Sequence, residues 1–112
     1  MANTKVNYGM TAKDLFNAKH ASKDVKEAID SGEVLTVTGC AIVAEGGTDR
    51  NGQPCDVGYI ATNDGVFGFI SSILLSSIPD LAEILESGEP IDIRFFAGVA
   101  KNGSEYYSFM IV

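Results

Sequence analysis

The stretch from Asp56 to Ile70, DVGYIATNDGVFGFI, carries a clear β-hairpin signal in this 112-residue chain. Asn63-Asp64-Gly65 in its middle has the residue types of a tight turn, because Asn and Gly tolerate a positive φ. The segments on either side, about 56–62 and 66–70, are rich in β-branched and aromatic residues. The sequence therefore predicts two antiparallel strands joined by this turn.

Further strands are predicted on both sides of the hairpin. Residues from Glu33 to Ala44 are almost wholly apolar, small or β-branched, which suits a long strand. A polar, Gly-rich loop from Glu45 to Pro54 follows it. The last two strands, Ile91 to Ala100 and Glu105 to Val112, are joined through Lys101-Asn102-Gly103-Ser104, in which Asn-Gly is again a hairpin signal.

An N-terminal helix is predicted from Thr11 to about Asp30. Thr11-x-x-Asp14 resembles a capping box at its start. Its apolar positions are Leu15, Phe16, Val25 and Ile29, and the stripe that they form is interrupted between Ala18 and Ser22.

A second helix is predicted after the hairpin. Its apolar residues recur at helical spacing and are Leu74, Ile78, Leu81 and Leu85. Ser77-x-x-Asp80, around Pro79, has the form of a helix cap. Gly88 ends the helix, and Pro90 prevents its continuation.

The order of elements is three strands, one helix and two strands after an N-terminal helical extension. This is the order of the five-stranded Greek-key OB barrel, a mainly β fold with its helix between strands three and four. We therefore expect residues 1–112 to form a single OB-like domain, with residues 1–31 as the extension. An open α+β roll with the same elements is the alternative.

The length and composition of the chain are those expected of one globular domain. A chain of 112 residues that is 46% hydrophobic can bury a core without metals or disulfides. No apolar run approaches the length of a membrane span, and the N-terminus lacks a secretory signal, so we expect a cytoplasmic protein with no membrane partner. Cys40 and Cys55 are interpreted as reduced structural thiols.

The net charge of -7 argues against nucleic-acid binding, because phosphate contact usually requires a basic excess. The charge is unevenly distributed. Residues 1–31 hold five Lys and four acids, whereas residues 32–112 hold three basic residues and eleven acids. Several acids are expected on or beside the second helix or in turns and are Asp80, Glu83, Glu86, Glu89, Asp49 and Asp64.

The sequence lacks the residue patterns of an enzyme. Its only histidine, His20, lies in a Lys-flanked polar stretch with no reason to meet either cysteine. Walker A, G-x-G-x-x-G and H-E-x-x-H motifs are absent. Asp49-Arg50-Asn51-Gly52 faintly resembles a calcium loop, but its glycine has the wrong offset. We therefore predict no catalytic activity, no metal and no cofactor.

OB barrels bind oligonucleotides across strands two and three, between the loops that join strands one to two and four to five. Such binding combines base stacking on aromatic rings with a few cations that follow the phosphates. The predicted strands supply Tyr59, Phe67 and Phe69, and the two loops supply Arg50, Asn51, Gln53, Lys101 and Asn102. Strand alternation does not decide whether Tyr59 points into the barrel or outward. It places Phe67 and Phe69 on the same face, so that both point inward or both point outward.

The last hairpin offers a second candidate surface. Ile91, Ile93, Phe95, Tyr107, Phe109 and Ile111 are predicted to be buried. Alternation then directs Arg94, Phe96 and Tyr106 outward. This aromatic and basic surface could bind DNA, form a dimer contact or support the N-terminal helix.

Several segments resemble the small single-stranded DNA-binding proteins of protein-primed Bacillus phages and of related phages and prophages of Gram-positive bacteria. The likeness covers most of the chain and is carried by residues 15–18, 30–38, 63–71, 86–90 and 101–109. The resemblance implies sequence-tolerant coating of single-stranded DNA during phage replication, in the cytoplasm of the host bacterium and without a cofactor. This chain departs from the pattern at its last loop, where Lys101 is the only Lys, so we expect modest affinity or self-association along the DNA or as a dimer.

Two other functions fit the sequence. An acidic interaction module could block a host DNA-binding protein by presenting carboxylates in place of phosphates. Such a mimic should gather its acids in one exposed array, whereas the acids here are scattered along the sequence. A structural subunit could instead add an edge strand to a partner through Phe109-Met110-Ile111-Val112.

Overall fold

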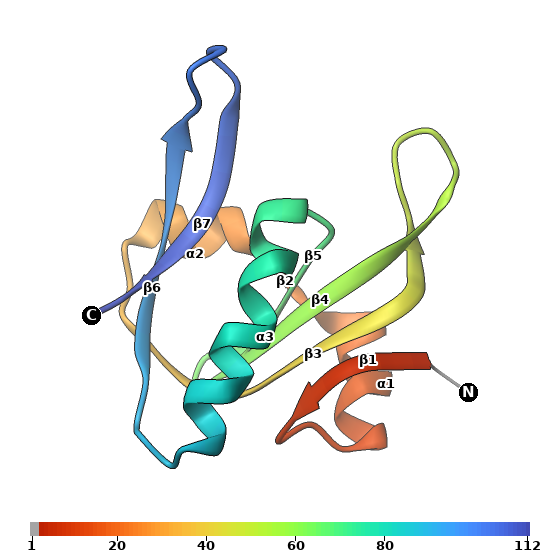
Figure 1. Cartoon of the computed structure of the whole chain (residues 1–112), viewed down its shortest axis with the longest axis vertical. Helices are drawn as coiled ribbons and strands as arrows, with labels where there is room; N and C mark the ends of the chain where they lie inside the picture. The colour runs from red at the N-terminus through yellow and green to blue at the C-terminus, as the bar shows by residue number, and fades with distance from the viewer. Residues whose placement is uncertain (1–2) are drawn as a thin grey trace.

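A curled mixed β-sheet forms the centre of the computed structural model, which describes residues 3–112 (Figure 1). The elements in chain order are β1 (Asn3–Tyr8), α1 (Ala12–Ala21), β2 (Lys23–Asp24), α2 (Val25–Ser31), β3 (Leu35–Thr48), β4 (Pro54–Thr62), β5 (Gly65–Phe69), α3 (Ser72–Glu86), β6 (Asp92–Val99) and β7 (Glu105–Ile111). The mainly β class is confirmed. No helix within residues 3–112 is long and apolar enough to cross a membrane.

The strand order along the sheet is β2-β5-β4-β3-β6-β7, and β1 pairs with β3. The long strand β3 is the hub, because its first residues pair with β6 and its middle pairs with both β1 and β4. Ala41, for example, lies between Asn7 of β1 and Tyr59 of β4. All pairs are antiparallel except the short parallel pair between β2 and β5.

Within residues 3–112 the sheet has seven strands, two more than the five expected. The two additional strands come from the N-terminal part of the chain. β2 is two residues long, which is too short for any periodic pattern. β1, NTKVNY, does alternate, with Val6 and Tyr8 packed against the core and Lys5 and Asn7 exposed, but the alternation is short and was not recognised as a strand. Tertiary pairing with β5 and β3 makes them strands.

The predicted helix from Thr11 to Asp30 is two helices, α1 and α2, separated by β2. The capping box is confirmed, with the Thr11 hydroxyl accepting from Asp14 N and the Asp14 carboxylate accepting from Thr11 N. Ser22 ends α1 in an extended conformation, and the Asp24 side chain caps α2. The interrupted apolar stripe marks this break.

Helix α3 begins at Ser72, so the cap predicted around Pro79 is wrong. The Ser77 hydroxyl donates to the Ile73 carbonyl within the helix, at 3.2 Å. Pro79 lies inside the helix and is exposed, where its missing N–H costs one backbone hydrogen bond. The four apolar residues predicted for this helix, Leu74, Ile78, Leu81 and Leu85, are buried as expected.

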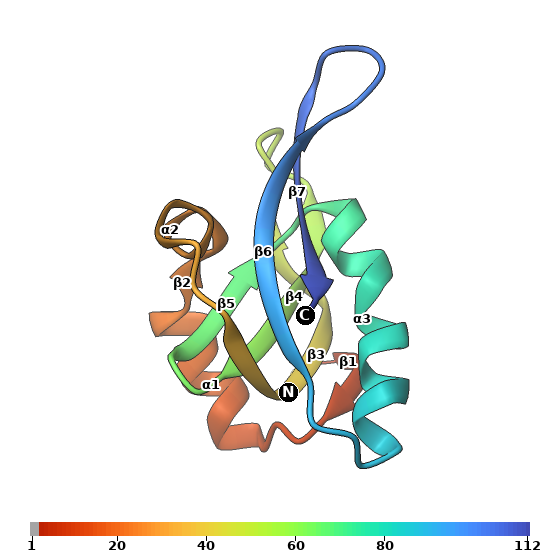
Figure 2. The same cartoon turned by 90° about the vertical axis from the view of Figure 1, so that its left-hand side faces the viewer.

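Buried side chains form one cluster on each face of the sheet. The larger cluster lies under α3 and α2 and includes Ile60, Phe67 and Phe95. The smaller one lies under α1 and includes Val57 and Tyr59. Helices α1 and α3 therefore cover opposite faces of the sheet, as Figure 2 shows.

Candidate nucleic-acid interface

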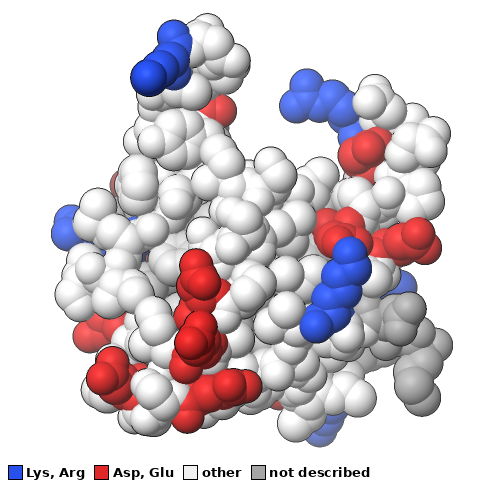
Figure 3. Space-filling model, in the orientation of Figure 1, with Lys and Arg blue, Asp and Glu red and all other residues white. Residues whose placement is uncertain are grey.

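Two hairpins project from the same side of the molecule (Figure 1). One is the β3–β4 connection with exposed Arg50, and the other is the β6–β7 connection with exposed Lys101. In Figure 3 a basic side chain stands at each tip, with an acidic side chain below it on each hairpin, and the surface lower down between the hairpins is mostly uncharged. The two loops predicted to flank a DNA site therefore face one another across a mostly uncharged surface.

Hydrogen bonds within each loop shape the tips. Asp49 Oδ1 accepts from Asn51 N at 2.9 Å and from Gln53 N at 3.0 Å. In the other loop Asn102 Oδ1 accepts from Ser104 N at 3.0 Å. The acid next to Arg50 is thus used to hold the turn, and Arg50 and Lys101 form no salt bridge within residues 3–112.

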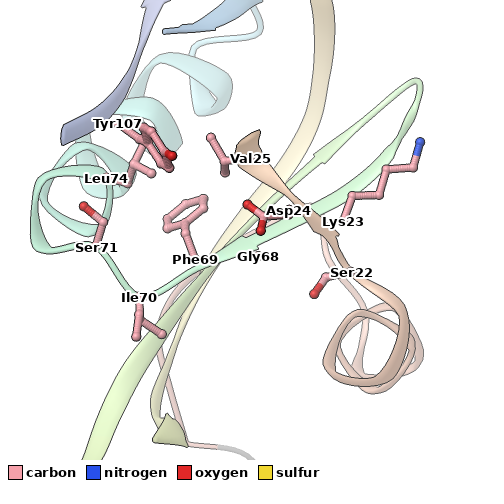
Figure 4. Close-up of a pocket in the computed structure, with 10 residues that line it drawn as sticks. All are labelled: Ser22, Lys23, Asp24, Val25, Gly68, Phe69, Ile70, Ser71, Leu74 and Tyr107. Carbon is pink, nitrogen blue, oxygen red and sulfur yellow. The ribbon is translucent and has the colours of Figure 1, made fainter. Parts of the chain in front are cut away.

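Two adjoining hollows lie where the first turn of α3 meets β5 and the β6–β7 hairpin. The first, of about 400 Å³, is lined by Ser22, Lys23, Asp24, Val25, Gly68, Phe69, Ile70, Ser71, Leu74 and Tyr107 (Figure 4). The second, of about 450 Å³, is lined by Ser71, Ser72, Ile73, Ala100, Asn102, Ser104, Glu105, Tyr106 and Tyr107. Because Ser71 and Tyr107 line both, we treat the two hollows as one and call it the central groove.

The central groove has aromatic and aliphatic walls. Figure 4 shows the side chains of Phe69 and Tyr107 approaching each other from β5 and β7. Both residues are half-buried and pack against the larger core cluster, which fixes them while part of each side chain stays accessible. Ile70 and Ile73 are 47% and 42% exposed, which is high for isoleucine. These surfaces suit the flat, apolar faces of nucleobases.

The predicted stacking roles of Tyr59 and Phe67 are wrong, because neither side chain reaches the surface. Tyr59 is 5% exposed beneath α1, and its burial raises the pKa of the phenol. Phe67 is 2% exposed and packs its ring 5.4 Å from that of Phe95. Phe67 and Phe69 do share the interior face of the sheet, but only Phe69 reaches the groove.

The outer face of the last hairpin has the predicted arrangement in part. Arg94 is exposed, and Phe96 and Tyr106 are half-buried. Tyr106 pairs with Gly98 across the hairpin. Its ring packs so closely on Gly98 that a Cβ atom at this position would lie 2.5 Å from Cζ of the ring. Tyr106 reaches the second hollow of the central groove, whereas Arg94 lines neither hollow.

Tyr107 was missed by sequence reasoning, which predicted a buried residue. It is half-buried because the end of the β6–β7 hairpin extends beyond the core. Further along the strand, Phe109 is only half-buried and Ile111 is exposed, so the burial predicted for both is also wrong. The one signal for Tyr107 was its hydroxyl, since a Tyr near a turn commonly keeps its polar end in water.

The other charges near the groove are partly paired. Lys23 lies 3.3 Å from the Asp64 carboxylate and 6.0 Å from the centre of the Phe67 ring. Asp24 lines the first hollow, but its Oδ1 accepts from Lys26 N at the start of α2. Glu105 is the acid that lines the second hollow.

The acids of α3 are not scattered in space. Asp80, Glu83, Glu86 and Glu89 are all exposed on this helix or in the turn after it, and Figure 3 shows acidic side chains gathered over this part of the molecule. The acidic surface of α3 is thus separate from the surface between the two hairpin tips.

Comparisons with protein-family models, curated proteins and solved structures gave no match. In the described part of the chain, no group of three or more His, Cys, Asp or Glu side chains is placed to hold a metal ion.

Proposed function

We propose that this protein binds and coats single-stranded DNA, with the strand lying in the central groove between the two projecting hairpins. The observation that carries the proposal is that exposed Arg50 and Lys101 lie on two hairpins that project from the same side of the molecule, and that the central groove beside the β6–β7 hairpin contains Phe69 and Tyr107. Aromatic rings stack on any base, and cations contact any phosphate, so such a site tolerates all sequences.

The strand order supports an OB-like interpretation of the fold. The strands β3 to β7 follow the sheet order β5-β4-β3-β6-β7, with α3 between β5 and β6. This corresponds to the strand order 3-2-1-4-5 of an OB barrel, and the two hairpins correspond to the loops with which OB barrels bind oligonucleotides. β1, β2, α1 and α2 are then additions to the barrel.

The role in phage or prophage replication rests on the resemblance of the sequence to phage single-stranded DNA-binding proteins. Coating requires no catalytic group. Stacking contributes about 1–3 kcal/mol per base, so two or three rings can hold a strand with few cations. A net charge of -7 is compatible with this mode because, of the fifteen acids, Asp24 and Glu105 are those that line the central groove in the described residues 3–112.

Fluorescence anisotropy of labelled oligo-dT, with a duplex of equal length as control, tests the proposal. We expect salt-sensitive binding of the single strand, weak or no binding of the duplex, and quenching of tyrosine emission as bases stack on Tyr107. Absence of single-strand binding at low salt and high protein concentration would contradict the proposal.

The gathering of acids on α3 favours one alternative, an acidic module that binds a DNA-binding protein in place of DNA. This function makes no use of the central groove. It predicts that oligo-dT does not bind, and that reversing the charge of Glu83 and Glu86 abolishes binding to the partner.

A further inference from the structure

Helix α1 presents an exposed aromatic residue with basic neighbours. Phe16 is 66% exposed and is the only phenylalanine in residues 3–112 that is largely exposed to solvent. Its ring lies 4.8 Å from that of His20. Lys13 and Lys19 are exposed and lie three residues before and after Phe16, which makes them its neighbours on the helix surface. We call these four residues the basic face.

Helix α3 presents the complementary arrangement on its exposed side. Pro79 is exposed and gives an apolar surface. Asp80, Glu83 and Glu86 lie one, four and seven residues after it, so they surround it on the side of the helix opposite the buried apolar residues. We call Pro79 and these three acids the acidic face.

The two faces lie on opposite sides of the molecule. Figure 2 shows α1 on one side of the sheet and α3 on the other. Figure 1 looks along the shortest axis of the molecule, which spans 23 Å, with α3 in front, α1 behind and the space between the hairpins seen end-on. A strand that follows this space would therefore run from the α3 side to the α1 side. Successive copies on one strand would meet with the α1 of one against the α3 of the next.

We propose that the basic face of one copy binds the acidic face of the next copy along the DNA, with Phe16 against Pro79. This inference rests on the proposed function. Because the contact joins two different surfaces, it propagates from copy to copy and does not close into a dimer. It gives a physical basis for cooperative coating.

The contact is expected to be weak in the absence of DNA. Exposed ion pairs contribute little and are screened by salt, and copies with a net charge of -7 repel one another. Two copies on the same strand are held at a high effective concentration, so that a weak contact becomes sufficient. Cooperativity should accordingly decrease as salt is raised.

Charge reversal on each face tests the contact. One variant carries Lys13→Glu and Lys19→Glu, and the other carries Glu83→Lys and Glu86→Lys. All four positions are exposed and lie outside the central groove. Asp30→Lys with Glu33→Lys is a control for the second variant, because it changes the net charge equally at exposed positions outside both faces.

The measurement compares the shortest oligo-dT that holds one copy with an oligo-dT of twice that length. For the wild type we expect the second copy to bind the longer oligo at least tenfold more tightly than the first. Each face variant alone should lose this advantage, and the control should retain it. An equimolar mixture of the two face variants should regain it, because every neighbouring pair of unlike variants then has opposite charges.

Two failures can be told apart. If the face variants keep the tenfold advantage, or if their mixture does not regain it, the contact proposed between α1 and α3 is wrong while single-site binding stands. If the wild type does not bind the short oligo-dT, the proposed function fails, and the cooperative contact fails with it.

Discussion

Tyr59 is buried beneath α1 and has a structural role, whereas Tyr107 lines the central groove and has a binding role in our proposal. Tyr107→Leu removes a ring from the central groove but keeps an apolar side chain against the core, so we expect affinity for oligo-dT to fall about tenfold, within the range of about 1–3 kcal/mol per stacked base. Fluorescence anisotropy at fixed salt measures this change.

Tyr59→Leu is the matched control, because it makes the same substitution beneath α1. We expect it to lower the free energy of unfolding in urea and to leave the affinity for oligo-dT unchanged. A tenfold loss of affinity in a folded Tyr59→Leu protein, with no loss for Tyr107→Leu, would place the strand on the side of the sheet that α1 covers. This result would contradict our proposal.

Cys40 gives a pH-dependent prediction for stability. It is fully buried, and burial, with a smaller contribution from Glu86, raises the pKa of its thiol from 9.0 to about 11. The folded state therefore holds the proton more tightly than the unfolded state. The resulting stabilisation is present below pH 9 and is lost as the pH rises towards 11.

Urea unfolding at pH 8 and pH 10.5 checks this expectation with Cys40→Ala as the comparison. The wild type should lose more of its free energy of unfolding between the two pH values than the variant, which lacks the thiol. Burial raises the pKa of Tyr59 in both proteins, so its effect is common to them. Equal losses would show that Cys40 does not titrate as described.

At the scale of elements, the two projecting hairpins carry the cations of the proposed site. Each phosphate contact to a single strand contributes about 0.7 to the slope of log affinity against log salt. Arg50→Gln and Lys101→Gln should each reduce the magnitude of the slope by about 0.7. Arg94→Gln is the control, since Arg94 is exposed but lines neither hollow of the groove.

Titrations at several salt concentrations give these slopes. A larger change in slope for Arg94→Gln than for the two loop variants would show that DNA binds to the outer face of the β6–β7 hairpin and would contradict the proposed site.

The sequence predicted those elements whose signals are local. The Asn63-Asp64-Gly65 turn predicted the β4–β5 hairpin, the Asn102-Gly103 turn predicted the β6–β7 hairpin, and the spacing of apolar residues predicted α3. β1 was missed although its polar residues alternate with Val6 and Tyr8, and β2 could not be predicted, because it is a strand only through its pairing with β5. For the same reason the single helix predicted from Thr11 to Asp30 was wrong, since β2 interrupts it.

The candidate site was predicted less well than the fold. Arg50 and Lys101 were found because polar loops between strands are exposed. The aromatic residues could not be assigned, because alternation groups residues by face without saying which face another element covers. α1 covers the face of Tyr59, and the curl of the sheet encloses Phe67.

For the whole molecule, the central claim is that a single strand lies in the groove between the hairpins. Mapping of backbone amide chemical shifts during titration with a short oligo-dT that holds one copy tests this claim most directly. We predict that the shifts concentrate in residues 49–53, 68–73 and 100–107, and that the amides of α1 stay in place. Shifts centred on α1 or on the outer face around Arg94 and Phe96, with none at residues 68–73, would contradict it.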